Sequence, residues 1–186
     1  RCSSAPTAPS VTPPPPAPPS PLDGTLQIRP ARPEDADALW RILEPTIRAG
    51  ETYALPPDMR REDALAYWLG GDRETFVAES ADGEVLGTYF LRANQVGGGG
   101  HVANGGYVTA PWATGRGVAR AMGEHSLARA RARGFRAMQF NFVVSTNVRA
   151  VQLWQRLGFA TVGRLPLAFR RPSGEYVDAL VMFQPL

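Results

Sequence analysis

Lysine is absent from the 186 residues, and all twenty basic residues are arginine. A Walker-type phosphate loop requires a lysine, so this class of nucleotide site is excluded. Cysteine occurs only at Cys2, which excludes an intrachain disulfide and a cysteine-ligated metal cluster, and we expect no metal site. Apolar runs stay far below the roughly 18 residues that cross a bilayer, and the first residues lack the apolar core of a signal peptide. We therefore expect a cytoplasmic protein with no membrane partner.

The net charge of +3 is small for a chain of this length. It does not favour a nucleic-acid partner, whose binding requires a strong basic surface. It is compatible with a small anionic ligand. The hydrophobic content of 44% is enough for one well-buried globular domain.

Proline is concentrated at the start of the chain, where residues 1–23 hold nine of the eighteen prolines. Such a segment buries too little apolar surface to fold. We therefore predict a disordered proline-rich tail over residues 1–24 and one folded domain over residues 25–186.

Within that domain, hydrophobic periodicity and turn signals predict an α/β protein with the element order β-α-α-β-β-β-α-β-α-β-β. Pro45 is expected to interrupt or kink the first helix, and Gly97 to Gly100 to form a flexible loop. The predicted strands cover residues 26–29, 76–79, 85–91, 101–109, 138–144, 159–162 and 176–183, and the helices cover 32–43, 58–68, 117–133 and 147–157.

A strand, a short loop with two glycines and a helix follow one another between Tyr107 and Ala119. The start of a helix offers unpaired N–H groups and partial positive charge, which suit a pyrophosphate. Gly115 and Gly117 let the main chain approach phosphate oxygens, and Arg116 and Arg120 add charge. A dinucleotide-binding fingerprint is excluded because Arg120 occupies the place of its third glycine.

A second block, Asn147 to Phe159, follows about thirty residues later. In this order and spacing, the two blocks resemble the GNAT superfamily of acetyl-CoA-dependent N-acetyltransferases, over residues 25–186. The resemblance implies a mixed, mostly antiparallel central sheet with helices on both faces, and acetyl-CoA as co-substrate. Thr114 departs from the Gln or Arg usual in the superfamily, although its hydroxyl is able to cap the helix or contact phosphate.

The resemblance also implies which residues contact acetyl-CoA. Asn147 is expected to contact the pantetheine arm or to be the N-cap of the last helix, and the two roles are compatible. Main-chain groups of the preceding strand bind the same arm, and the loop and first helical turn bind the pyrophosphate; these residues are Tyr107, Val108, Thr109, Thr114, Gly115, Arg116, Gly117, Val118, Ala119 and Arg120.

Acetyl transfer requires a neutral amine, a stabilised oxyanion and a proton for the departing thiolate. Many superfamily members supply that proton from a tyrosine at the position of Trp154 here. Tryptophan has no suitable proton, and Trp154 lies on the apolar stripe of its helix, so core packing is its expected role. Proton delivery by water, or direct loss of the thiolate, is the simpler hypothesis.

Two asparagines are candidate substrate contacts. In the strand over residues 138–144, alternation places Gln139, Asn141 and Val143 on one face, with Met138, Phe140, Phe142 and Val144 on the other. Asn104 precedes Gly105 and Gly106, where a bulge is expected to splay the sheet. Asn104 and Asn141 would then converge on a substrate carboxylate or carbonyl; the alternative is that each amide satisfies a buried main-chain group.

Three segments, over residues 49–56, 102–108 and 140–147, narrow the resemblance to the fungal azetidine-2-carboxylate acetyltransferases and their bacterial relatives. Those enzymes acetylate the ring nitrogen of proline-like imino acids. The resemblance implies that Asn104 and Asn141 act at the substrate and that Glu51, Thr52 and Tyr53 wall the acceptor site. Glu51 is the candidate proton acceptor or amine contact, and a solvated loop carboxylate is the alternative.

The predicted function is therefore N-acetylation of a small amino or imino acid. Two alternatives remain: an acetyltransferase for a protein N-terminus or an antibiotic amine, and a catalytically silent acyl-CoA-binding module. A homodimer formed through an exposed final strand is a further hypothesis.

Overall fold

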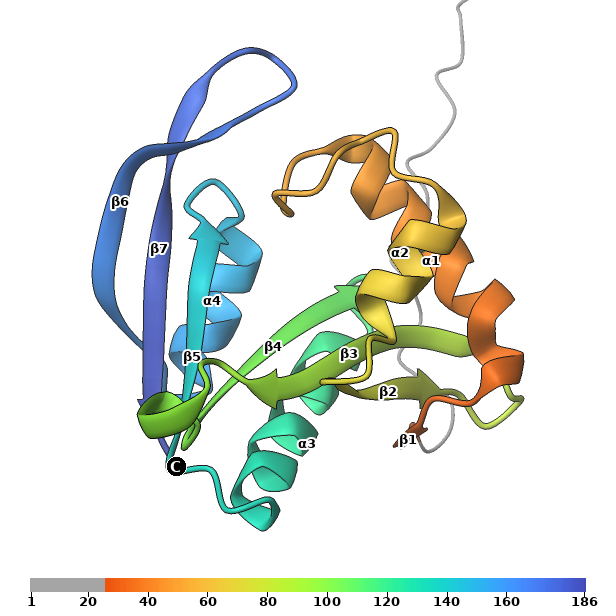
Figure 1. The fold of residues 1–186 in the computed structure, drawn as a ribbon. Helices are drawn as coiled ribbons and strands as arrows, with labels where there is room; N and C mark the ends of the chain where they lie inside the picture. The colour runs from red at the N-terminus through yellow and green to blue at the C-terminus, as the bar shows by residue number, and fades with distance from the viewer. Residues whose placement is uncertain (1–25) are drawn as a thin grey trace, which may run out of the picture.

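A strongly twisted sheet forms the centre of the protein, and helices cover both of its faces (Figure 1). The computed structural model describes residues 26–186, so the predicted proline-rich tail lies outside the described residues. Within this range the elements follow the predicted order. The strands are β1 (Gln27–Pro30), β2 (Glu74–Glu79), β3 (Val85–Ala93), β4 (Val102–Thr109), β5 (Ala137–Val144), β6 (Ala160–Arg170) and β7 (Tyr176–Pro185), and the α-helices are α1 (Ala36–Ala49), α2 (Arg61–Trp68), α3 (Val118–Ala132) and α4 (Val148–Arg156).

The strand order across the sheet is β1-β2-β3-β4-β5-β7-β6. Neighbouring strands are antiparallel except β4 and β5, which are parallel. The predicted mixed, mostly antiparallel architecture is confirmed. The final strand β7 lies between β5 and β6, so the two edge strands are β1 and β6, contrary to the expectation that the last strand is exposed.

Consecutive residues of β3 show which helices cover which face. The Phe90 ring packs edge-on against Trp68 of α2, with the centroids 4.9 Å apart. Its neighbour Tyr89 points the other way and shares a 2.7 Å hydrogen bond with His125 of α3. Helix α4 joins α3 on that second face, where Gly123 of α3 leaves room for the Leu157 side chain that follows α4. Helices α1 and α2 therefore cover one face, and α3 and α4 the other.

Pro45 does not interrupt the first helix. Helix α1 continues past Pro45 to Ala49, because its apolar residues Leu39, Ile42, Leu43 and Ile47 recur at helical spacing and are all buried. In the connection between β3 and β4, Gly97–Gly99 form one turn of 3₁₀-helix, closed by a 3.0 Å bond from the Gly100 N–H to the Gly97 carbonyl.

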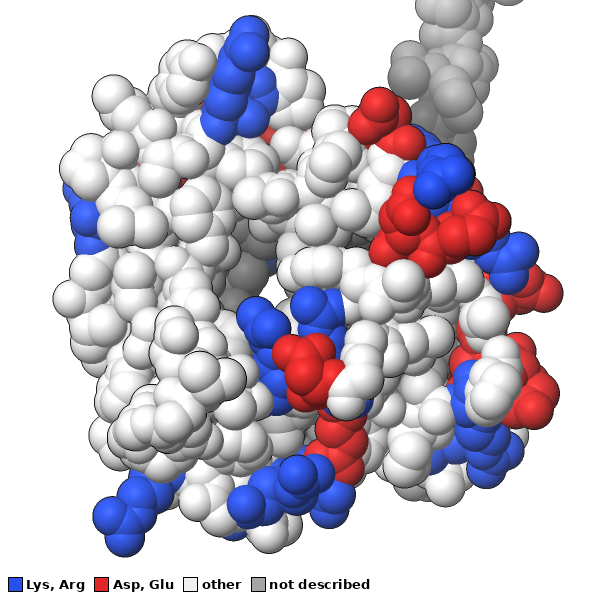
Figure 2. Space-filling model, in the orientation of Figure 1, with Lys and Arg blue, Asp and Glu red and all other residues white. Residues whose placement is uncertain are grey.

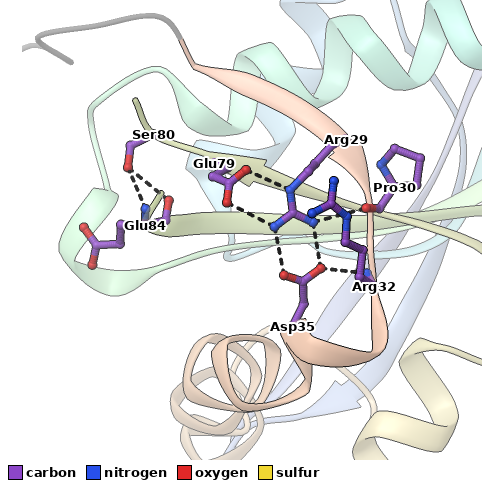
Figure 3. Close-up of polar contacts among 7 residues, drawn as sticks. All are labelled: Arg29, Pro30, Arg32, Asp35, Glu79, Ser80 and Glu84. Atoms are coloured by element: carbon purple, nitrogen blue, oxygen red, sulfur yellow. Dashed lines mark hydrogen bonds and ion pairs between the residues drawn. The ribbon is translucent and has the colours of Figure 1, made fainter. Parts of the chain in front are cut away.

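The β1 edge is held by an ionic cluster (Figure 3). Arg29 donates two bonds to Asp35, at 2.7 and 2.9 Å, and two to Glu79, at 2.8 and 3.1 Å. Only 12% of the Arg29 side chain and 9% of the Asp35 side chain are exposed. The bond from Arg29 lowers the pKa of Asp35 below its usual range. This cluster ties the entry to α1 onto β1 and β2.

Candidate active site

The parallel strands β4 and β5 pair over a short distance and then separate. Their register covers only Val102 with Ala137 and Ala103 with Met138. Beyond that point the Asn104 side chain donates a 2.8 Å hydrogen bond to the Gln139 carbonyl, in place of a main-chain N–H of β4. The remainder of β4 thus presents main-chain groups toward an opening between the two strands. The register between β3 and β4 is continuous, so a bulge at Gly105 and Gly106 does not cause this separation.

Hydrogen bonds at both ends of β4 define which of its main-chain groups face the opening. The Asn94 N–H bonds to the Val102 carbonyl and the Ala110 N–H bonds to the Leu86 carbonyl, both at 2.8 Å. Alternation along an antiparallel ladder then directs the main-chain groups of Val108 at β3, and those of Tyr107 and Thr109 at the opening. Two of the three residues predicted to pair with pantetheine are therefore in position to do so.

Tyr53 occupies part of this opening from the loop that follows α1. Its hydroxyl accepts a 2.8 Å bond from the Tyr107 N–H and donates a 3.0 Å bond to the Tyr107 carbonyl. Burial raises the pKa of Tyr53, so the phenol stays protonated. The hydroxyl acts as a substitute strand partner for Tyr107. Tyr53 also lines a small apolar pocket, together with Leu55, Tyr67, Trp68 and Val108.

The loop before α3 has the backbone expected of an anion site. Gly115 and Gly117 have φ values of +83° and +84°, in the left-handed region that favours glycine. Gly117 is the N-cap of α3, and no side chain among residues 26–186 caps this helix. A Cβ added at Gly117 would meet none of these residues within 4 Å, so the surface above the loop is open. The first-turn amides of Val118, Ala119 and Arg120 have no partner within an α-helix.

The polar side chains of this loop differ in their surroundings. Thr114 is exposed and three residues before the N-cap, so its predicted capping role is wrong. The exposed guanidinium of Arg120 bonds at 2.8 Å to Glu124, one turn further along α3. The Nε of Arg116 is buried and has no hydrogen-bond partner among residues 26–186. Arg116 is therefore the better placed of the two arginines to respond to an incoming phosphate.

Helix α4 contributes packing and a cap. Asn147 is its N-cap, and the side-chain oxygen accepts a 3.3 Å bond from the Ala150 N–H, as predicted for the capping alternative. Trp154 is 7% exposed, and its ring lies 4.7 Å from those of Tyr107 and Phe140. The expected core role of Trp154 is confirmed.

The predicted alternation along β5 fails beyond Asn141, because a register shift falls between Phe140 and Val143. Phe140 and Val143 both join the main core, whereas Phe142 and Val144 pack in a second cluster with Phe169 and Val177. Sequence alternation cannot foresee such a shift, since one unpaired residue reverses every later side chain.

Asn141 is exposed, so it does not need to satisfy a buried main-chain group. Its amide donates a 2.7 Å bond to Asn94, and its carbonyl oxygen accepts a 2.8 Å bond from the Gln139 side chain. Gln139 also receives the bond from Asn104 at its main-chain carbonyl. Asn104 and Asn141 are thus linked through Gln139, on the face covered by α1 and α2.

Glu51 lies in the loop after α1 and is ion-paired. Its Oε2 accepts a 2.9 Å bond from Nε of Arg171, which lies in the turn between β6 and β7. Next to it, Gly50 has φ +60°, and an added Cβ would stand 3.3 Å from Pro172 of the same turn. The loop bearing Glu51, Thr52 and Tyr53 is therefore in contact with the β6–β7 hairpin. Figure 2 shows this face hollowed between the hairpin and α1 and α2.

Sequence reasoning missed Arg171, Asn94 and the two arginines Arg73 and Arg92. Arg92 belongs to β3 and is paired directly with Asn104 in the register between β3 and β4. A signal for Arg92 was available in the sequence. Thr88, Phe90 and Arg92 occupy every second position of β3, so their side chains project from one face of the strand, and an arginine follows two buried residues on that face.

Comparison with known proteins identifies the class to which this fold and site belong. The model of the Acetyltransferase (GNAT) family matches residues 37–159. The chain belongs to this family and is an N-acetyltransferase. It is 34% identical over 151 residues to the N-acetyltransferase aca1 of Schizosaccharomyces pombe, covering 73% of this chain and 72% of the relative.

Solved structures agree. A GCN5-related N-acetyltransferase from Kribbella flavida is 43% identical with a TM-score of 0.83, and the match covers 87% of this chain and 98% of that protein. A phosphinothricin acetyltransferase from Sinorhizobium meliloti, solved in complex with AcCoA, has the same fold at 23% identity, with a TM-score of 0.76 and coverage of 87% and 89%.

Each helix among residues 26–186 is too short or too polar to span a bilayer. Within the same residues, no group of three or more His, Cys, Asp or Glu side chains is arranged to hold a metal ion.

Proposed function

We propose that this N-acetyltransferase uses acetyl-CoA to acetylate the amine of a small amino or imino acid. The observation that carries the proposal is the opening between β4 and β5 beside the start of α3. A thioester lying along β4 would reach this opening, while its diphosphate would rest on the amides at Gly117.

On the cofactor side, the proposal assigns the pyrophosphate to Gly115, Gly117 and the first turn of α3, with Arg116 as its charged partner. The two left-handed glycines and the buried, unpaired Nε of Arg116 support this assignment. The pantetheine arm would pair with the main chain of Tyr107 and Thr109. Because the Tyr53 hydroxyl bonds to Tyr107, pantetheine would replace or share that contact.

On the acceptor side, the proposal keeps Asn104, Asn141 and the segment from Glu51 to Tyr53. Asn104 lies at the end of the β4–β5 ladder, where a thioester lying along β4 would end. Glu51 has one carboxylate oxygen bonded to Arg171, which leaves the other for an amine contact. This loop contacts the β6–β7 hairpin and so closes one side of the site. A closed side supports a small acceptor molecule and not an extended peptide.

The reaction joins the amine nitrogen to the thioester carbonyl carbon and breaks the C–S bond. The nitrogen loses a proton, and the departing thiolate gains one. The indole N–H of Trp154 is far too weak an acid to protonate a thiolate, and the Tyr107 hydroxyl points at Ser126 of α3, 2.7 Å away. Water is therefore the proposed proton carrier, with Tyr53 as the protonated phenol at the opening.

The cofactor assignment is tested by calorimetric titration of CoA into Gly117→Ala. The matched control is Gly134→Ala at the other end of α3, where φ is +82° and an added Cβ likewise meets none of residues 26–186 within 4 Å. Both changes impose similar backbone strain, but only the first places a methyl group above the amides. We expect about tenfold weaker CoA binding for Gly117→Ala alone. Equal affinities in the two variants would contradict the assignment.

The acceptor class is tested by thiol release from acetyl-CoA with azetidine-2-carboxylate, 4-hydroxyproline and the free amino acids. Turnover with one or more of them supports the proposal. Turnover only with aminoglycoside-like amines or peptide N-termini would replace this acceptor class. CoA binding without turnover on any amine would indicate a silent binding module.

A further inference from the structure

Four polar side chains form a row across the sheet, on the face covered by α1 and α2. Arg92 is paired with Asn104. Glu74 is paired with Leu91, and Ala103 with Met138. Continuing each register by one residue sets Arg73 against Arg92 and Gln139 against Asn104. Paired residues project from the same face of a sheet, so the row runs from the start of β2 to the opening beside β5.

Arg73 is buried without the hydrogen bonds that a guanidinium needs. Only 9% of its side chain is exposed. The guanidinium carbon lies 4.1 Å from the ring centre of Tyr67 and 4.6 Å from that of Phe90. Its Nε and Nη1 have no hydrogen-bond partner within residues 26–186. Aromatic stacking offsets part of the desolvation, but unmade bonds to a buried cation remain costly.

Arg92 shows the same deficit. Its Nη1 donates a 3.0 Å bond to Asp72, but its Nε is buried and has no partner in the described part of the chain. Asp72 is 61% exposed and lies 3.7 Å from Nε of Arg73, where it forms no hydrogen bond with that arginine. The two guanidinium groups of Arg73 and Arg92 therefore share the single exposed carboxylate of Asp72. These three side chains together carry one uncompensated positive charge.

We propose that Arg73 and Arg92 bind the carboxylate of the acceptor, an inference that rests on the proposed function. A carboxylate supplies the missing charge and accepts from the unpaired N–H groups. Neighbouring strands are about 4.8 Å apart, so a carboxylate held at Arg92 lies roughly one strand from the opening past Asn104. In an α-amino or α-imino acid one carbon separates the amine from the carboxylate. The same contact would therefore direct the nitrogen toward the thioester.

This arrangement selects an acceptor with a free α-carboxylate. A peptide N-terminus or a neutral amine presents no anion and would leave both arginines unpaired. Figure 2 shows basic and acidic side chains along one border of the hollow on this face.

The test is calorimetric titration of azetidine-2-carboxylate, and of its carboxamide, into the CoA-saturated protein. We expect the acid to bind the unchanged protein about 10- to 100-fold more tightly than the amide. Arg92→Gln and Arg73→Met should remove this preference, and Arg73→Lys should restore part of it. Asp72→Asn should tighten binding of the acid, because it frees Arg92. Arg60→Gln, an exposed arginine at the start of α2 with a 76% exposed side chain, is the control and should retain the preference.

Several outcomes would overturn the inference: equal affinity for acid and amide, a preference that survives in Arg92→Gln and Arg73→Met, or no binding of the acid at millimolar concentration. Turnover of the acid together with any of these results would leave the proposed function standing and remove the carboxylate site. A preference that depends on Arg92, without turnover of any amine, would support the site and reject the proposed function.

Discussion

Two arginine clusters lie on the same face of the sheet, and they differ in how their guanidinium groups are satisfied. At the β1 edge, Arg29 bonds to two carboxylates, Asp35 and Glu79, with four hydrogen bonds of 3.1 Å or shorter. Near the opening between β4 and β5, Arg73 and Arg92 share only Asp72, and both have buried N–H groups without partners among residues 26–186.

The difference separates groups that stabilise the fold from groups available to a ligand. A buried ion pair with every hydrogen bond made is costly to break, because each partner would be left unpaired. An arginine that is buried and incompletely bonded already bears that cost in the free protein, and a bound anion would relieve it. On the proposed reading, buried polar atoms without partners indicate a binding surface more sharply than charge alone does.

The largest expected effect is on stability, in Arg29→Met. This change leaves Asp35 buried without its bidentate partner, and we expect a loss of about 2–4 kcal/mol in the free energy of unfolding. Urea denaturation at pH 7 measures it. Arg60→Met is the matched control: its pair with Asp63 is exposed, so this change should have a much smaller effect. Equal losses of stability in the two variants would show that the Arg29 cluster does not stabilise the fold more than an exposed ion pair does.

Tyr53→Phe tests a group that stabilises the free protein and is also proposed to give way to a ligand. Its hydroxyl satisfies the N–H and the carbonyl of Tyr107, so we expect a loss of about 1–2 kcal/mol in the free protein. If pantetheine takes over those main-chain groups, the loss should be smaller in the presence of saturating CoA. Urea denaturation with and without CoA measures both. An identical loss in the two conditions would show that pantetheine does not replace the hydroxyl.

Most of the fold could be predicted from the sequence, because its elements have strong local signals. The apolar run of β3 and the glycine that follows α3 indicate their elements without tertiary context. The failures occurred where packing overrides local preference: Pro45 remains inside α1 because the apolar face continues to Ile47, and the shift after Phe140 reverses the end of β5.

Some residues of the candidate site carry local or motif signals in the sequence. Gly115 and Gly117 are the glycines of the loop before α3 and have left-handed φ values, and Asn104 lies where the pairing of β4 with β5 ends. Arg92 carries a signal in the phase of β3, but Arg73 and Arg171 could not be found in this way. Arg73 contacts Phe90 of β3, and Arg171 bonds to Glu51 in the loop after α1 from the distant β6–β7 turn. No local pattern encodes these contacts.

His125 offers a smaller test, through pH. Burial lowers the pKa of His125, which bonds to Tyr89 and faces Arg129 and Glu74. The unfolded chain then takes up a proton near pH 6.5 before the folded protein does. Stability should therefore fall as the pH decreases from 7 toward 5, by at most about 1.4 kcal/mol per pH unit.

Urea denaturation across this pH range measures the slope in the unchanged protein and in His125→Gln, which should lose it. His101 is exposed, so His101→Gln should retain the slope. A slope that persists in His125→Gln would mean that another group titrates between pH 5 and 7.

The smallest expected effect on stability is in Arg92→Gln, and it is the sharpest test of the comparison. This change removes the ion pair with Asp72, which stabilises little because Asp72 is 61% exposed. It also removes a buried Nε that has no partner in residues 26–186, which should raise stability. The loss of repulsion between Arg92 and Arg73 should raise stability as well. We expect the free energy of unfolding to change by less than about 0.5 kcal/mol, against several for Arg29→Met. Urea denaturation of the two variants side by side measures the contrast. A loss of about 2 kcal/mol in Arg92→Gln would mean that both clusters hold the fold, and that unpaired N–H groups do not indicate a ligand here.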